Sequence, residues 1–184
     1  MDYKAKLLTH YEINWGIKGE ECLLDKKIQN ENENFRIFKF KPIPKREYWI
    51  YATIFTTSKE SETYRYREFH ILSLDENNGC IDILKALAYY YNTISPVNLW
   101  DTINFGIELT QNSKCTFGLI SLPYLFGPNL EDFVVDNGIV KYYWIIPITE
   151  SEVVFKKKNG IDALESNFEN AQFDLLDTNR KAVV

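Results

Sequence analysis

Apolar side chains recur along the chain with helical spacing in two segments, and each segment predicts a helix. The stretch AKLLTHYEINW (5–15) places four of them on one helical face, namely Leu7, Leu8, Tyr11 and Trp15. The stretch NGCIDILKALAYYYN (78–92) carries a continuous apolar stripe with the same period. We therefore expect a short N-terminal helix and a longer central helix, the latter with its apolar stripe buried in the core.

Aromatic and β-branched residues, partly alternating with polar ones, predict strands in other parts of the chain. Three such segments are 35–40, 48–55 and 64–74. Two further runs, 116–122 and 138–148, are too apolar for burial on one side only, so they predict central strands. Pro147 should end the second run or lie where the sheet needs no backbone donor.

The segment PITESEVVFKKKNG (147–160) contains the residues that typically begin a helix and those that typically end one. Thr149 followed three residues later by Glu152 forms a capping box. The lysines 156–158 would then lie in the last turn, where positive charge complements the helix dipole, and Asn159–Gly160 would end the helix. A second helix should follow from Ile161. The lysine run is thus interpreted as a helix end rather than a binding patch.

The stretch GLISLPYLFGPNLEDF (118–133) mixes large apolar residues with two prolines and fits neither a strand nor a helix throughout. Pro123 should end a core strand, and Gly127–Pro128 should turn the chain. The loop between them presents Tyr124, Leu125 and Phe126. These side chains either fold back over the sheet, as most large apolar residues do, or form a recognition loop with Tyr124 partly exposed.

Composition limits the class of protein. The 184 residues, 45% of them hydrophobic and 15% aromatic, suffice for a single domain spanning 1–184 that buries about 70% of its unfolded surface. The three cysteines are widely spaced and odd in number, which favours free thiols in a reducing cytoplasm. No export signal and no membrane span are expected. A net charge of −5 argues against direct nucleic-acid binding and favours solubility or a basic protein partner.

No motif for catalysis, a cofactor or a metal is present, so none of these sites is predicted. His10 and His70 lie in a predicted helix and strand without ligand spacing, and we expect His70 to be a hydrogen-bonded sheet histidine. Acidic residues do cluster in predicted loops: Glu60, Glu62, Asp75, Glu76, Glu131, Asp132 and Asp136. A hydrolase would need two of them across a cleft, whereas solvated loop positions are their default interpretation.

The order of several uncommon strings resembles the bacterial suppressor of fused domain family over about residues 15–184. The strings are YWIYATIF, EFHILSL, ILKALAYYY, LWDTINFG, GLISLPYLFGP, YWIIPITESE, NGIDALE and RKAVV. The resemblance implies an α+β fold with a central twisted sheet, mixed or mostly antiparallel, flanked by helices and similar to the N-terminal domain of suppressor of fused. Two departures occur, in TTSKESETYRYR (56–67) and at Ala182.

The resemblance also implies a cytoplasmic, non-enzymatic protein-binding module. Bacterial members are thought to be immunity proteins that neutralise a toxin module, which for an acidic chain suggests a basic nuclease. A regulatory adaptor that sequesters a transcription factor or another peptide-bearing partner is the alternative, and a carboxylate-dependent hydrolase is a third hypothesis. The candidate partner-binding residues are Glu60, Glu62, Tyr124, Phe126, Glu131, Asp132 and Asp136.

Overall fold

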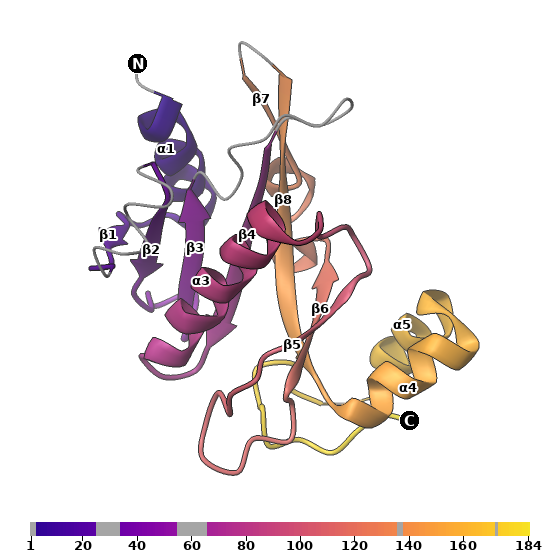
Figure 1. Cartoon of the computed structure of the whole chain (residues 1–184). Helices are drawn as coiled ribbons and strands as arrows, with labels where there is room; N and C mark the ends of the chain where they lie inside the picture. Colours follow the sequence, from indigo (N-terminus) through magenta and orange to yellow (C-terminus); the bar gives the residue numbers. More distant parts are fainter. Residues whose placement is uncertain (1–2, 25–33, 55–65, 136–137, 172) are drawn as a thin grey trace.

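The computed structural model describes residues 3–24, 34–54, 66–135, 138–171 and 173–184. Its centre is one eight-stranded sheet with the order β1-β2-β3-β4-β8-β6-β5, and β7 pairs with β8 beside that path (Figure 1). The strands are β1 (Glu20–Glu21), β2 (Arg36–Phe40), β3 (Trp49–Ile54), β4 (Tyr66–Ser73), β5 (Thr102–Asn104), β6 (Phe117–Ser121), β7 (Asp132–Val135) and β8 (Gly138–Ile148). The five strands expected from the sequence are confirmed.

The long strand β8 organises the sheet. It runs parallel to β4 on one side, and on the other it pairs antiparallel with β7 and then with β6. The remaining strand pairs are antiparallel. Pro147 lies opposite Gly118 of β6, beyond Ile145, the last β8 residue that pairs with β4. It therefore removes no donor that β4 requires, as predicted.

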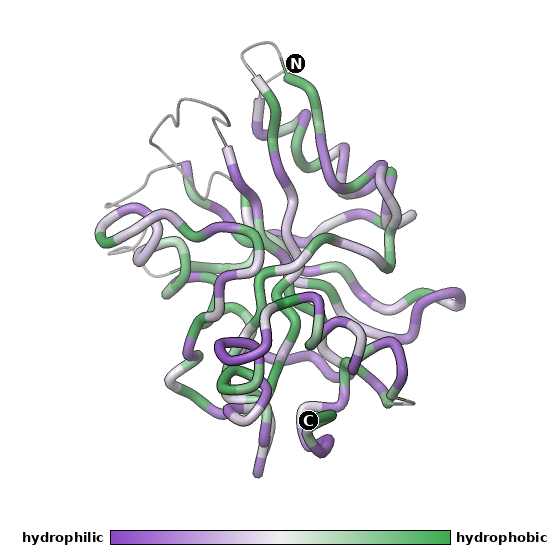
Figure 2. Tube along the Cα trace, turned by 90° about the vertical axis from the view of Figure 1, so that its right-hand side faces the viewer, coloured by the Kyte–Doolittle hydropathy of each residue, from purple (hydrophilic) through white to green (hydrophobic). Residues whose placement is uncertain are grey.

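Helices cover both faces of this sheet, which confirms the α+β class. The helix α1 (Tyr3–Trp15) packs its buried side chains against one face, and α3 (Asn78–Thr93) packs against the other, which is turned toward the viewer in Figure 1. Adjacent β8 residues serve the two cores, since Tyr142 lies in the α1 layer and Tyr143 in the α3 layer. Figure 2 shows apolar segments running through the middle of the molecule, with polar stretches mainly outside.

Two short helices follow β8, with the boundaries that the sequence predicted. In α4 (Glu150–Asn159), the Thr149 N–H donates to Glu152 Oε2 at 2.8 Å and the Glu152 N–H donates to Thr149 Oγ1 at 3.3 Å, which completes the capping box. Gly160 ends α4 with a φ of +89°, a conformation that favours glycine. The chain then continues directly into α5 (Ile161–Asn170).

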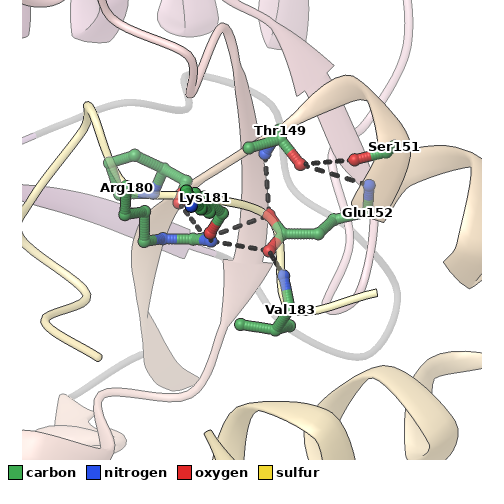
Figure 3. A network of polar contacts seen from close by, with 7 residues as sticks. Thr149, Ser151, Glu152, Arg180, Lys181 and Val183 are labelled. Carbon is green, nitrogen blue, oxygen red and sulfur yellow. Dashed lines mark hydrogen bonds and ion pairs between the residues drawn. The ribbon is translucent and has the colours of Figure 1, made fainter. Parts of the chain in front are cut away.

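The C-terminal tail, residues 173–184, has no helix or strand, but hydrogen bonds and an ion pair hold it to the rest of the chain. The Thr178 carbonyl accepts hydrogen bonds from the N–H groups of Lys114 and Cys115, at 2.9 and 3.0 Å. Farther along, Arg180 reaches the buried carboxylate of Glu152 (Figure 3). The tail thereby ties the loop before β6 to the start of α4.

Candidate functional site

The strand β5 ends the sheet and leaves one backbone edge unpaired within the described ranges. The Ile120 N–H donates to the Asp101 carbonyl at 2.9 Å, and the Phe105 N–H donates to the Thr116 carbonyl at 3.0 Å. Backbone groups of successive residues in an antiparallel strand point to opposite sides. Residues 101, 103 and 105 therefore face β6, and the N–H and C=O groups of Thr102 and Asn104 face outward.

A groove of about 630 Å³ runs beside this edge. One wall comes from α3, and the end of α4 contributes Lys156 and Lys157 to the other side. Its apolar lining residues include Ile83, Leu87, Tyr90, Val97, Ile103 and Phe105. Tyr90 is 41% exposed although it is a large aromatic residue. An open strand edge beside a groove lined by both apolar and polar side chains can bind an extended peptide.

Trp100 lies two residues before this edge strand and has an unusual backbone. Its φ is +71°, a left-handed conformation that is rare for a bulky residue. Two hydrogen bonds hold it there: its N–H donates to the Ile120 carbonyl at 2.8 Å, and its carbonyl accepts from Lys156 Nζ. The lysines of α4 are thus in the last turn, as predicted, but two of them also line the groove.

The opposite end of the sheet is less suited to adding a strand. There β1 has only two residues, Glu20 and Glu21, and both are exposed. Their carboxylates form ion pairs with lysine and arginine side chains of neighbouring elements, including Lys39 and Arg36. Short, charged edge strands discourage pairing with another chain. Of the two ends of the strand order, the β5 edge is therefore the better candidate.

The loop that the sequence singled out is divided between core and surface. It forms two short 3₁₀ helices, η1 (Tyr124–Phe126) and η2 (Pro128–Leu130). Tyr124 and Leu125 are 52% and 53% exposed, whereas the Phe126 ring packs 5.6 Å from both Trp15 and His70. The expectation that Tyr124 is partly exposed is confirmed. The alternative, in which all three side chains fold back, is wrong because only Phe126 does so.

An acidic surface surrounds Tyr124, and α5 supplies much of it. The Tyr124 hydroxyl donates to Glu165 Oε1 at 3.1 Å. Burial and then this bond, together with the charges of Glu165, Glu131 and Glu169, raise the pKa of Tyr124 to about 12. Glu131 was predicted as part of a binding loop, but the α5 residues were not. They are separated from the loop by more than thirty positions, so no local pattern connects them.

The other predicted contact residues are only partly brought together. Asp132 lies at the start of β7 and is exposed, and its carboxylate forms a 2.6 Å ion pair with Lys141, which compensates its charge. Glu60, Glu62 and Asp136 lie outside the described residues. Their roles, like partner binding by the loop, stay predictions.

His70 departs from expectation. It is fully buried in a row across the sheet with Ala52, Trp144 and Ser121. Neither of its ring nitrogens meets a hydrogen-bond partner in the part of the chain that the structure describes, so the predicted hydrogen-bonded histidine is wrong. Burial lowers the pKa of His70 to about 3, which keeps the ring neutral. The His70 ring instead packs against the rings of Trp15 and Phe126.

The chemistry available elsewhere is limited. Within the described ranges, no three His, Cys, Asp or Glu residues are placed to hold a metal ion. The three cysteines are free and buried, and burial raises the pKa of Cys80 to about 12, so its thiol is a poor nucleophile. Among those same residues no helix is both long and apolar enough to cross a membrane.

Comparison with known proteins decides the family. The family model for suppressor of fused protein (SUFU) matches residues 31–181. The chain belongs to this family. A SUFU homolog from Neisseria gonorrhoeae is 31% identical, and the match covers 100% of this chain and 98% of that one with a TM-score of 0.82. The resemblance inferred from the sequence strings is therefore confirmed. No curated protein matches the chain.

More distant SUFU structures share the fold alone. The Sufu–Fu complex contains a chain 12% identical to this one, with a TM-score of 0.70 over 98% of this chain and 91% of that chain. Drosophila Suppressor of Fused is 13% identical, with a TM-score of 0.68. The match covers 98% of this chain but only 51% of the Drosophila protein. The present SUFU chain thus corresponds to about half of its fly relative.

Proposed function

We propose that this SUFU chain is a non-enzymatic protein-binding module that captures an extended segment of its partner as an added strand on β5. The observation that carries the proposal is the outward-facing backbone of Thr102 and Asn104, at the β5 edge of the described sheet and along the groove. In strand addition, main-chain hydrogen bonds provide affinity, while pockets for alternate side chains provide specificity.

The groove offers such pockets. Ile83 and Leu87 on α3 and Phe105 after β5 are largely buried side chains that line the groove, and the half-exposed Tyr90 is the large aromatic residue accessible among them. Aromatic residues of this kind are frequent anchors of protein interfaces. The solved complex of Sufu with Fu shows that a protein of this fold associates with another protein, which supports a binding role.

The partner that we propose is a toxin module in the cytoplasm, which this SUFU chain would neutralise as an immunity protein. The charge of −5 and the acidic surface around Tyr124 support a basic partner such as a nuclease. Sequestration of a regulatory protein is the alternative. Competition by a short synthetic peptide from the partner distinguishes the toxin module from the regulatory protein. The peptide competes fully only when the groove provides most of the interface, as we expect for a regulatory protein and not for a toxin module that also contacts the acidic surface.

The first experiment is a tagged pull-down of the chain from its own host at moderate salt, with mass spectrometry of stoichiometric partners. A protein with a C-terminal toxin module supports immunity, and co-expression should then rescue growth from that toxin. A DNA-binding or other regulatory protein supports the adaptor role instead. Repeated recovery of the bare chain would contradict both.

The edge itself is tested by replacing Thr102 with proline. This change removes one outward N–H donor and no bond to β6, so the fold should persist while strand addition fails. Thr102→Val is the matched control, because it removes the hydroxyl but keeps the N–H. We expect at least tenfold weaker binding of the recovered partner by the proline variant and near-normal binding by the valine variant. Equal binding by both would rule out capture at β5.

A further inference from the structure

The helix α4 is held at one end by the C-terminal tail and at the other by the start of β5. At its beginning, Glu152 is fully buried and accepts hydrogen bonds from Arg180 Nη1 at 2.6 Å, Arg180 Nη2 at 2.9 Å and the Val183 N–H at 3.1 Å (Figure 3). Four residues later, on the same side of the helix, Lys156 donates to the Trp100 carbonyl. The tail and the edge strand are thus joined through one helical turn.

Trp100 needs this support. A left-handed conformation is unfavourable for a bulky residue, and it persists only where surrounding contacts determine it. At Trp100 these contacts are the N–H bond to the Ile120 carbonyl and the carbonyl bond from Lys156. The Trp100 N–H thus makes the first bond to β6, and the carbonyl of the next residue, Asp101, accepts the second from the Ile120 N–H. The conformation of Trp100 therefore fixes where β5 begins and which of its amides face outward.

We propose that Lys156 is a positioning residue for the binding edge. Its ammonium group, anchored by the tail through Glu152 and Arg180, holds Trp100 in the left-handed conformation and thereby presents Thr102 and Asn104 to the partner. The inference rests on the proposed function, since it assigns to the groove a residue that sets its geometry rather than one that contacts the ligand.

The surroundings of Lys156 suit this role. It is half-buried, whereas its neighbours Lys157 and Lys158 are exposed. Burial lowers the pKa of Lys156, and the nearby charge of Asp101 acts in the opposite direction. A partly desolvated ammonium that donates to a carbonyl makes a stronger bond than a solvated one. Lys158 lies in the same helical turn but does not line the groove, so it offers a matched control.

The first test is amide hydrogen exchange in the chain without any partner. Lys156→Met keeps most of the side-chain stem but removes the donor, and we expect about tenfold less protection of the Trp100 and Ile120 amides. The amide of Phe69, which donates to Thr53 Oγ1 in the sheet centre, reports global stability and should not change. Lys158→Met should leave all three amides unchanged, and Lys156→Arg should restore protection. Unchanged protection at Trp100, or an equal loss at Phe69, would overturn the inference.

The second test measures affinity with a defined probe. Linear decapeptides are selected from a random display library on the wild-type chain, and one whose binding is lost in Thr102→Pro is kept. We expect about tenfold weaker binding by Lys156→Met, recovery in Lys156→Arg and no change in Lys158→Met. Equal binding by Lys156→Met and wild type would refute the positioning role. If no edge-binding decapeptide is found, capture at β5 fails, whereas exchange at Trp100 still decides the role of Lys156. Lys156→Leu, which also has no donor, replaces the methionine variant if that variant does not fold.

Discussion

Glu152 and Arg180 lie 28 residues apart in the sequence, yet their side chains form an ion pair with two hydrogen bonds. The two side chains are 0% and 3% exposed. Arg180 also donates to the Pro147 carbonyl at 3.1 Å, and its guanidinium lies 4.7 Å from the centre of the Phe173 ring. Because the capping bond from Thr149 and the bond from Val183 use further positions on the Glu152 carboxylate, the buried charge is well satisfied. This pair is the main polar anchor of the tail.

Removing one partner of this pair should destabilise the fold strongly. Arg180→Met leaves the Glu152 carboxylate buried without its counter-ion, which typically costs about 3–5 kcal/mol. We expect a loss of that size in the free energy of unfolding, measured by urea denaturation. Lys181→Met is the control, because its exposed side chain should contribute less than about 0.5 kcal/mol. The double variant Glu152→Gln/Arg180→Met should recover part of the loss. A loss under about 1 kcal/mol in the single variant would contradict the anchor role.

Acid should destabilise the fold through His70. Burial lowers the pKa of His70 to about 3 in the folded chain, whereas an unfolded histidine titrates near its ordinary value of 6.5. Between these values the unfolded state binds more protons, so the stability falls as the pH drops through this window. The slope approaches about 1.4 kcal/mol per pH unit, and we expect about 2 kcal/mol of loss from His70 between pH 7.5 and 5.

The measurement compares urea denaturation of wild type and His70→Leu across that range. The leucine variant should lose about 2 kcal/mol less on acidification, because it has no proton to accept at this position. His10→Gln is the control. Burial also lowers the pKa of His10, but this side chain is only half-buried, so its contribution should be smaller. Parallel pH profiles of wild type and His70→Leu would show that His70 is not the group responsible.

The sequence predicted those parts of the fold that depend on neighbouring residues. The capping box of Thr149 and Glu152 and the buried stripe of α3 were found because their signals lie within a few positions of one another. His70 was misjudged because its environment comes from Trp15, Trp144 and other distant segments. A period of two identifies a strand residue but not what its side chain meets.

The groove was not predictable for the same physical reason. Its floor, β5, has only three residues and no strand pattern of its own, and its walls come from α3 and α4. The lysine run at 156–158 was correctly interpreted as a helix end, but nothing local indicates that Lys156 reaches the Trp100 carbonyl, 56 positions earlier. Pairing order and long-range contacts decide such a site, and a single sequence does not encode them in local spacing.

Packing beneath the groove depends on the absence of a side chain at Gly118. A Cβ there would lie 2.6 Å from Ile145 Cγ2 and 2.7 Å from Phe105 Cε1, well inside contact distance. Gly118→Ala should therefore cost about 1–3 kcal/mol in unfolding free energy and displace Phe105, which lines the groove. Urea denaturation and the amide chemical shifts of Thr102 and Asn104 measure the two effects. Adding Phe105→Leu should recover the part of the loss that the Phe105 ring causes, and no recovery would place the damaging contact at Ile145.

Electrostatic steering by the surface around Tyr124 gives the last prediction. If the partner is basic, replacing Glu131, Glu165 and Glu169 by glutamine should slow its association about three- to tenfold at low salt, with a smaller effect on dissociation. The difference should shrink above about 0.5 M salt, where charges on the surface are screened. Glutamine still accepts the hydrogen bond from the Tyr124 hydroxyl, so the local structure should persist.

A matched control removes the same number of charges at exposed positions elsewhere, with Glu20→Gln, Glu47→Gln and Asp75→Asn. Both triple variants change the net charge equally, so a difference between them reports the location of the charge rather than its sum. Stopped-flow association with the partner recovered by pull-down gives the two rates. If the two variants associate at equal rates, the acidic surface around Tyr124 does not guide the partner, and the net negative charge of the chain is enough to explain the salt dependence.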